Sequence, residues 1–297
     1  MSQKKSFRCK FTQKVSLKKS INKLFLLPSI FFSINLLLCS LKPSYGVLSR
    51  HGLIPLVNSL DVPGLMARRV EDLELYLQLL SGRDKKDSTT IEFQSDANES
   101  PRPFKIGIPQ EYFCDGITDE VVESVSQACQ VLEMGGNTVV PVNLPHTDLA
   151  VPCYSVLNPC EVASNMARYD GLQYGLRAED ESSTEALFAA TRSGGFNEVV
   201  RGRILAGNYF LLKKNYEEFL GKALKVRRLI LNDFNAVWAD DVDFLLTPVT
   251  LSDAPSYENF VSADNRTQTA KQDHCTQPVN LAGLPAVTVP YKLSKRN

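Results

Sequence analysis

The sequence predicts an α/β fold with a partly parallel sheet, and two patterns carry this prediction. Two short apolar stretches, residues 104–109 and 138–142, flank a longer segment. In that segment, residues 118–134, the apolar residues have the spacing of an amphipathic helix. A strand, a helix and a strand of these lengths predict a crossover unit. Residues 242–248 and 286–290 are apolar segments that end at proline, and we expect them to be further buried strands.

The stretch from residue 41 to residue 64 predicts an ordered loop. Gly46, Gly52 and Gly64 permit backbone conformations that other residues avoid. Pro43 and Pro63 fix φ and disfavour helix just before them. We therefore expect a tight, irregular connection in this region.

A helix is expected to begin near residue 68 and to end before Gly82, which is placed as a cap. Its apolar side would consist of Val70, Leu73, Leu75, Leu77, Leu79 and Leu80. Residues 84–90 predict a polar loop. Residues 92–103 are acidic and contain two prolines, which predicts a flexible connector.

The helix over residues 118–134 begins with Thr118 at the capping position and ends at Gly135 and Gly136. Its buried side is expected to consist of Val121, Val122, Val125, Ala128, Cys129, Val131 and Leu132.

Further helices are expected over residues 151–170, 196–205 and 209–238, and over part of residues 273–284. The third of these carries four cations, Lys222, Lys225, Arg227 and Arg228. We expect them to form a solvated helix face, with a contact to RNA or to a partner protein as the alternative.

The composition of the chain excludes few classes of function. The chain has 297 residues and a formal net charge of zero, so bulk charge gives no case for nucleic-acid binding. Its seven cysteines form no C-x-x-C pair, and its three histidines are dispersed, so no metal site is predicted. Scattered cysteines are typical of reduced thiols in a reducing compartment.

The amino-terminal part has a different character. The first 23 residues carry eight lysines and arginines, the next 18 are largely apolar, and the first acidic residue is Asp61. A basic stretch before an apolar one is compatible with a transit peptide, a secretory signal or a membrane anchor through residues 24–41, which are near the lower limit for spanning a bilayer. An alternative first exon joined at Leu41 is the remaining interpretation. Mitochondrial targeting is the first of the targeting alternatives.

Three strings then resemble a known family. They are Leu-Lys-Pro-Ser-Tyr-Gly with the loop that follows it (residues 41–64), Glu-Val-Ala-Ser-Asn-Met-Ala-Arg-Tyr-Asp-Gly (residues 161–171) and Thr-Gln-Pro-Val-Asn-Leu-Ala-Gly-Leu-Pro (residues 276–285). Together they resemble the amidase-signature enzymes, and within that family the A subunits of glutamyl-tRNA(Gln) amidotransferases. The resemblance begins at Leu41. It implies that residues 1–40 are a non-family tail and that residues 41–297 are a partial domain, shortened at both ends, with an incomplete three-layer α/β/α fold and a mixed sheet.

The resemblance also implies a function. The A subunits hydrolyse glutamine and pass ammonia to partner B and C subunits, where glutamyl-tRNA(Gln) is amidated with ATP and Mg²⁺. The tRNA would be met only through that complex, and no cofactor would be bound by this chain. In the family, glutamine is held by a tyrosine, an arginine and an aspartate, which match Tyr154, Arg203 and Asp273. Without the family, these would be a packing aromatic, a surface cation and an N-cap.

The family's catalytic Ser-Ser-Lys region is not matched. It would lie before residue 41, where this sequence has its basic and apolar stretch, and no Gly-Gly-Ser-Ser-Gly-Gly-Ser run occurs elsewhere. Ser59 with Asp61 lacks a base, and Ser44 with Lys42 is too close in sequence to replace it. We therefore expect the chain to be inactive alone. The alternatives are a non-catalytic fragment that binds partner subunits, either free or tethered to a membrane, and an active member of another amidase branch, such as a fatty-acid amide hydrolase.

Overall fold

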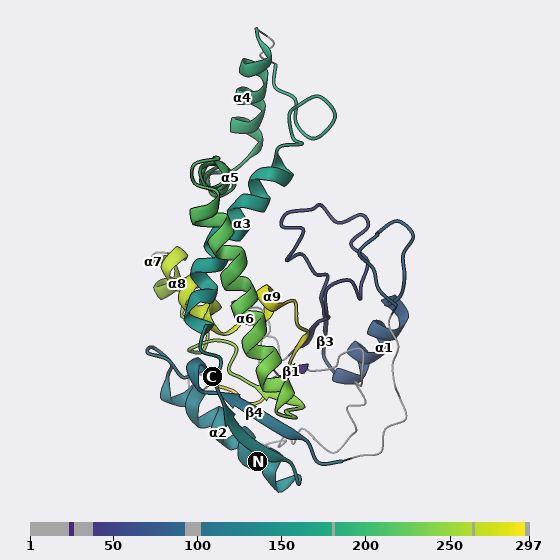
Figure 1. Ribbon diagram of the computed structural model, residues 1–297, viewed down its shortest axis with the longest axis vertical. Coiled ribbons are helices and arrows are strands. Elements are labelled where there is room, and N and C mark those ends of the chain that lie inside the picture. Colours follow the sequence, from purple (N-terminus) through teal and green to yellow (C-terminus); the bar gives the residue numbers. More distant parts are fainter. Residues whose placement is uncertain (1–23, 27–37, 93–101, 180–181, 263–264, 295–297) are drawn as a thin grey trace, which may run out of the picture.

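The computed structural model describes residues 24–26, 38–92, 102–179, 182–262 and 265–294 (Figure 1). Within these residues the strands form one sheet of order β3-β2-β7-β1-β6-β4-β5. The bounds are β1 Leu24–Leu26, β2 Cys39–Lys42, β3 Leu65–Ala67, β4 Lys105–Pro109, β5 Thr138–Val142, β6 Phe244–Leu246 and β7 Ala286–Thr288. Strand β2 runs antiparallel to β3 and β7, whereas the pairs from β7 through β1, β6 and β4 to β5 are parallel. The sheet is therefore mixed, as predicted.

The predicted crossover is confirmed. Strand β4 leads into helix α2 (Asp119–Met134), and β5 then pairs in parallel with β4 along its whole length. Thr118 holds the N-cap position of α2, but its side chain makes no capping hydrogen bond, which corrects the expected capping. Its backbone N–H instead donates to Leu251 O at 2.8 Å. The start of α2 is thus fixed by a tertiary contact.

The remaining helices lie on the two faces of the sheet or project from it. Their bounds are α1 Val70–Leu80, α3 Ala150–Met166, α4 Thr184–Gly195, α5 Glu198–Leu211, α6 Lys222–Ala239, α7 Tyr257–Ser262, α8 Asn265–Gln272 and α9 Gln277–Ala282. A π-helical turn, Glu217–Gly221, leads into α6, and 3₁₀ turns cover Gln110–Tyr112, Thr147–Leu149 and Asp273–Cys275.

Three layers result, as predicted. On one face of the sheet, Leu41 packs with Leu73 and Leu77 of α1, and Ile106 and Ile108 pack with Val125 of α2. The other face, which includes Leu245 and Ala286, packs on α3, α6 and α9 in the largest apolar cluster. Adjacent strand residues point to opposite faces, so Leu245 joins one core and Leu246 the other.

The apolar faces predicted for α1 and α2 are wider than the faces that the structure buries. Leu75, Leu79 and Leu80 of α1 are more than half exposed, and only Leu73 and Leu77 are buried. In α2, Val122 and Val131 are exposed, whereas Val125 is buried. Each helix lies on short strands that cover a single stripe of its surface, so the flanking apolar residues are left in solvent. Helix α1 ends before Gly82, as predicted: Ser81 is its C-cap, and Gly82 follows with a φ of +132°.

The helix boundaries between residues 196 and 239 also shift. The predicted break near residue 206 lies inside α5, which continues to Leu211, and the chain turns at residues 212–216. No helix is predicted from the sequence at the positions of α4, α7 and α8. The predicted connector at residues 92–103 lies largely outside the described residues.

The tail predicted for residues 1–40 contributes two pieces of described backbone. Strand β1 lies between β6 and β7 and is parallel to both, and β2 begins at Cys39. The predicted boundary at Leu41 thus falls inside a strand. In the described part of the chain, no helix is both long enough and apolar enough to cross a membrane, and residues 27–37 of the predicted membrane anchor lie outside that part.

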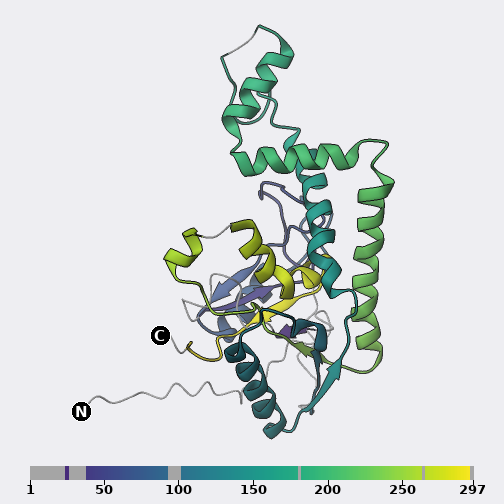
Figure 2. The same ribbon diagram turned by 90° about the vertical axis from the view of Figure 1, so that its left-hand side faces the viewer.

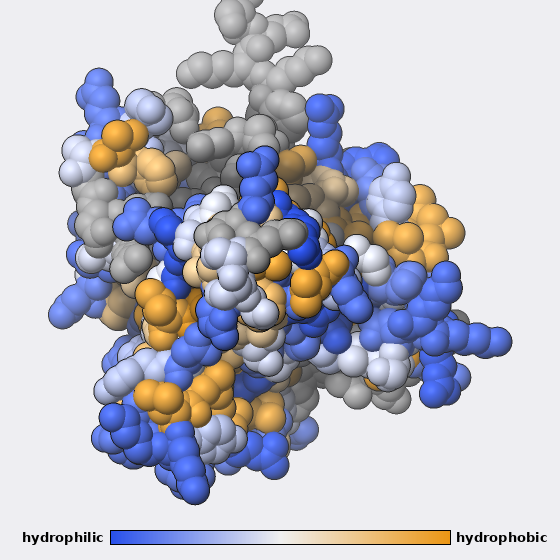
Figure 3. Space-filling view, turned by 90° about the horizontal axis from the view of Figure 1, so that it is seen from above, coloured by the Kyte–Doolittle hydropathy of each residue, from blue (hydrophilic) through white to orange (hydrophobic). Residues whose placement is uncertain are grey.

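An arm of helices stands away from the sheet. Helix α5 lies across the upper ends of α3 and α6, with α4 beyond it (Figure 2). From above, hydrophobic side chains form separate groups among hydrophilic ones (Figure 3). The exposed large apolar residues of this arm include Leu172, Leu176, Val199, Leu205 and Leu212.

The crossing of α5 over α3 depends on Gly207. A Cβ at this position would overlap Pro159 O and would lie 2.8 Å from Ala163 Cβ, both on α3. Backbone cannot yield as a flexible side chain does. The closeness of the two helices therefore requires glycine at this position.

We expect Gly207→Ala to lower the free energy of unfolding by about 1–3 kcal/mol, the usual cost of overpacking a close contact. The matched control is Gly194→Ala in α4, where the nearest atom would be 3.8 Å away. The control should be neutral or gain up to about 1 kcal/mol from helix propensity. Urea denaturation measures both variants, and equal effects would contradict the close crossing.

Candidate amino-acid-binding site

The glycine-rich loop is held by the polar loop at residues 84–90. Ser49 Oγ donates to Asp84 Oδ2 at 2.7 Å, and Arg50 N donates to Asp87 Oδ2 at 2.8 Å. Gly46 has a φ of +86°, and a Cβ there would overlap Thr89 O. The glycine predicted from the pattern is thus required both by its φ and by the close approach of the second loop.

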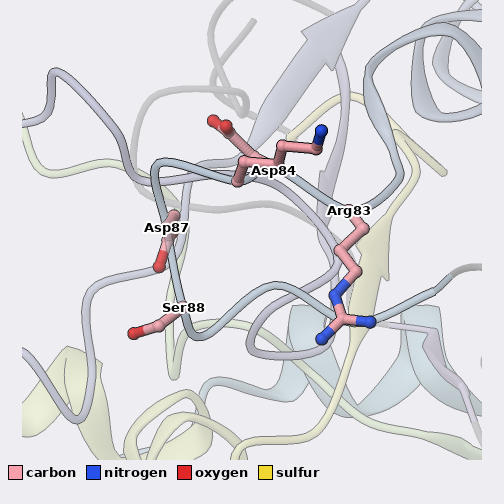
Figure 4. A pocket seen from close by; sticks show the side chains of 5 residues that line it. Arg83, Asp84, Asp87 and Ser88 are labelled. Atoms are coloured by element: carbon pink, nitrogen blue, oxygen red, sulfur yellow. The ribbon is translucent and has the colours of Figure 1, made fainter.

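Asp84 and Asp87 also line a surface depression of about 440 Å³ with Arg83, Lys85 and Ser88 (Figure 4). Hydrogen bonds from the Thr89 side chain, from Arg50 N and from Thr89 N lower the pKa of Asp87 to about 2. The Ser49 hydroxyl, together with Lys86 N, lowers the pKa of Asp84. Both carboxylates are therefore occupied in joining the two loops.

The end of the glycine-rich loop lies along α3. Asn58 Nδ2 donates to Asn165 Oδ1 at 3.2 Å, and Asn165 Nδ2 donates to Leu56 O at 3.0 Å. Ser59 N donates to Glu161 Oε2 at 2.9 Å, and the Ser59 hydroxyl donates to the other oxygen of Glu161. These contacts fix the loop on one stripe of the helix.

Arg227 of α6 connects Ser59 of the loop to helix α9. Its Nη1 donates to Ser59 Oγ at 2.8 Å and its Nη2 to Ser59 O at 3.1 Å, while its Nε donates to Leu281 O of α9 at 2.7 Å. This corrects the prediction that Arg227 belongs to a solvated face. Lys222, Lys225 and Arg228 are exposed, as predicted. We call Ser59, Glu161 and Arg227 the Ser59 clamp.

The three predicted binding residues come from three different elements. Tyr154 lies on α3 and is partly buried, Arg203 lies on α5 and is exposed, and Asp273 lies in the 3₁₀ turn before α9 and is partly buried. Burial raises the pKa of Tyr154, the charge of Arg203 lowers it, and the charges of Asp273 and Asp61 raise it. The fold thus brings Arg203 and Asp273 within electrostatic range of the Tyr154 hydroxyl.

Some polar groups around Tyr154 and Asp273 lack a hydrogen-bond partner or a partner of opposite charge. Asn158 Nδ2 donates to the Tyr154 hydroxyl at 2.8 Å, and Gln277 Nε2 donates to Asp273 Oδ2 at 3.3 Å. Burial raises the pKa of Asp273, and no cation in the described ranges forms an ion pair with it. Gln277 Oε1 is buried and has no hydrogen-bond partner among the described residues. A cation, an anion and a hydroxyl in this arrangement complement a zwitterionic amino acid.

The family model described as Amidase matches residues 37–297. The chain belongs to the amidase family. It is 51% identical over 261 residues to the A subunit of the mitochondrial glutamyl-tRNA(Gln) amidotransferase of Pediculus humanus subsp. corporis, and 55% identical to that of Xenopus tropicalis. Each alignment covers 86% of this chain but only 53% and 50% of the relative, so the chain spans about half the length of the curated relatives it matches.

Solved structures agree with this amidase-family assignment. The crystal structure of the A subunit of glutamyl-tRNA(Gln) amidotransferase from Thermotoga maritima matches with a TM-score of 0.65 and 31% identity, over 87% of this chain and 52% of that one. A 6-aminohexanoate cyclic dimer hydrolase matches with a TM-score of 0.68 and 16% identity, over 89% of this chain and 56% of that one, which shows the shared fold. The predicted family and fold class are confirmed.

Sequence reasoning missed the contacts of Arg227 and the position of Asp61. Arg227 stands among other cations on a helix, and nothing in its spacing separates a partly buried guanidinium from its solvated neighbours. Asp61 was considered only as a partner of Ser59. A signal was present only for Asp61, which lies in the same matched string as Ser59.

We expect Asp87→Asn to destabilise the protein by about 2 kcal/mol at neutral pH, because it removes charge-assisted hydrogen bonds from Arg50 N and Thr89. The pKa of about 2 in the folded protein lies below the ordinary value of 3.8. The carboxylate therefore stabilises the fold above about pH 4, and this contribution is lost as pH falls towards 2. Urea denaturation of wild type and variant at pH 7, 4 and 2.5 measures it. A constant difference across this range would contradict the assignment.

Proposed function

We propose that this chain is the amino-acid-binding part of a glutamine-hydrolysing A subunit of glutamyl-tRNA(Gln) amidotransferase. The observation that carries the proposal is that Arg203 and Asp273 lie within electrostatic range of the Tyr154 hydroxyl. The names and the 51–55% identity of its relatives support it. The ligand is L-glutamine.

Each group has a chemical role in this proposal. Arg203 presents a planar guanidinium that pairs with the α-carboxylate in bidentate fashion. Asp273 accepts from the α-ammonium, and its raised pKa reflects the cost of burying that carboxylate before a cation arrives. The Tyr154 hydroxyl orients the ligand between them. These roles leave the side-chain amide of glutamine free to extend towards a nucleophile.

Hydrolysis requires a nucleophile that this chain does not offer among its candidate serines. The Ser59 hydroxyl is bound to Glu161 and Arg227, so it has an anionic acceptor and a cation as neighbours, not a neutral base. Burial lowers the pKa of Lys42 to about 8, but its amine contacts Pro43 O at 3.5 Å. We infer that the chain alone binds glutamine without releasing ammonia, and that the complete reaction needs the Ser-Ser-Lys region of the family.

Assembly with B and C subunits, and contact with tRNA through them, belong to the same proposal. ATP and Mg²⁺ are assigned to that complex. The carboxylates of Asp84 and Asp87 do not fit a Mg²⁺ ion, because both accept hydrogen bonds from loop residues and stand beside Arg83 and Lys85. No group of three candidate metal ligands occurs in the part of the chain that the structure describes.

Glutamine binding tests the proposal directly. We expect Arg203→Ala to weaken binding of L-glutamine at least tenfold, because a charged hydrogen bond is lost. The control Arg228→Ala removes an exposed cation from α6 and should bind as wild type does. Isothermal titration calorimetry measures both. No binding by the wild-type chain, or equal losses in the two variants, would reject the site.

A glutaminase assay on the same preparation tests inactivity. We expect no ammonia above background from the purified chain, with or without purified B and C subunits, because the described residues include no serine activated by a base. Retention of the chain on immobilised B and C subunits would support the proposed assembly. Ammonia release at the rate of a complete A subunit would overturn the inference about the missing nucleophile.

The proposed location is mitochondrial, in keeping with the names of the relatives. We expect a reporter fused to residues 1–45 to colocalise with a mitochondrial marker, because the basic residues precede an apolar segment in the manner of a targeting sequence. Replacing the eight lysines and arginines among the first 23 residues by glutamine should abolish this localisation. A reporter that stays in the cytosol would reject the targeting role.

A further inference from the structure

Helix α9 and the 3₁₀ turn before it carry two polar side chains of the candidate site. Asp273 lies in the turn, and Gln277 is the first residue of α9. The turn and α9 both contact α3, the helix that carries Tyr154. Gln277 is only 9% exposed, and the other end of α9 is held by the hydrogen bond from Arg227 Nε to Leu281 O at 2.7 Å. The side chain of Gln277 therefore has a fixed place beside Asp273.

The side-chain amide of Gln277 has a defined orientation. A carboxylate can only accept hydrogen bonds, so the amide turns its Nε2 towards Asp273 and donates to Oδ2 at 3.3 Å. Its Oε1 lies on the other side of the same amide. That oxygen is buried and has no hydrogen-bond partner among the described residues. Gln277 thus uses its donor on Asp273 and leaves its acceptor unused.

The two acceptors, Asp273 and Gln277 Oε1, lie one amide group apart, and both are incompletely satisfied. A buried oxygen without a donor costs about 1–3 kcal/mol, and a partly buried carboxylate without a cation is also unfavourable. An ammonium group supplies three N–H donors and a positive charge. A water molecule would supply donors but not the charge that Asp273 lacks. An ammonium group is therefore the ligand group that satisfies both acceptors.

We propose that Gln277 Oε1 accepts a hydrogen bond from the α-ammonium of the bound amino acid, and that Gln277 and Asp273 together select ligands that carry this group. This inference rests on the proposed function. It adds direction to the charge of Asp273, because one carboxylate attracts any cation, whereas two acceptors at a fixed separation favour a cation with several N–H donors.

A neutral acceptor suits this role better than a second carboxylate would. The ligand also carries an α-carboxylate, which another anion would repel, whereas an amide oxygen does not. Terminal amide torsions have broad minima, so a small rotation that turns the buried Oε1 towards the ligand costs little. The position of Gln277 at the start of a helix held at its far end by Arg227 keeps the backbone still during this rotation.

Two variants separate an acceptor for the ligand from a side chain that only holds Asp273. Gln277→Met fills a similar volume but has neither the amide donor nor the amide acceptor. Gln277→Glu keeps an acceptor oxygen and loses the donor to Asp273. If Gln277 only holds Asp273, both variants lose the same function. If Gln277 contacts the ammonium, Gln277→Glu keeps what Gln277→Met has lost.

The test titrates L-glutamine and 4-carbamoylbutanoate, which lacks the α-amino group, into each protein by calorimetry. We expect Gln277→Met to weaken glutamine binding about tenfold, as for the loss of a hydrogen bond to a charged group, and to leave 4-carbamoylbutanoate unaffected. Gln277→Glu should bind glutamine more tightly than Gln277→Met does, and should bind 4-carbamoylbutanoate more weakly than wild type because it adds a negative charge. The control Gln78→Met changes an exposed position of α1 and should alter neither affinity.

The outcomes separate this inference from the proposed function. If wild type does not bind glutamine, the proposed function fails and this inference fails with it. If wild type binds and Gln277→Met keeps its affinity for glutamine, the role of Gln277 fails alone. Equal losses of glutamine affinity in the two Gln277 variants show that the residue only holds Asp273. An equal loss of both ligands in Gln277→Met, with a melting temperature below that of Gln78→Met, shows a structural role, and either result overturns the inference.

Discussion

The Ser59 clamp is the interaction on which the arrangement of the site depends. Arg227 of α6 reaches a serine in one loop and the carbonyl of Leu281 in α9, while Glu161 of α3 binds the same serine. An arginine can do this because its five donors are fixed in one plane. Partly buried charges are tolerated here because Arg227 donates to three acceptors and Glu161 accepts from two donors. Without the clamp, the loop end and α9 would lose these hydrogen bonds to α6, and the contacts of Asn58 and Asn165 would remain to hold the loop on α3.

Close contacts between backbone segments are the second constraint on the fold. Gly207 lets α5 lie directly on the backbone of α3 at Pro159, and Gly46 lets one loop lie against Thr89 of the other. The first contact positions the helix that carries Arg203, and the second positions the loop that leads to Asp61. Elements from distant parts of the chain, among them the helix that carries Arg203, are thus brought together at places where no side chain stands between two backbones.

Much of the architecture was predictable because local pattern and topology agree. The β4-α2-β5 unit could be read from sequence, because short apolar strands flanking an amphipathic helix leave few other arrangements. The exposure of several leucines of α1 could not be predicted in this way. Helical spacing identifies an apolar stripe but not the width of the surface that will cover it. The capping of α2 failed for a similar reason: its N-terminal end is held by a distant carbonyl and not by the Thr118 side chain.

The sequence alone determined the family, the mixed α/β fold and three of the residues proposed to bind the ligand, because these depend on residue type and on strings that persist in order along the chain. Only the tertiary structure decided that Arg227 is a partly buried contact between α6, the loop at Ser59 and α9. The physical reason is that charge identity is a property of one residue, whereas burial and partnership depend on elements far apart in the chain. Arg227 and Ser59 are separated by 168 positions, and no local pattern encodes their meeting.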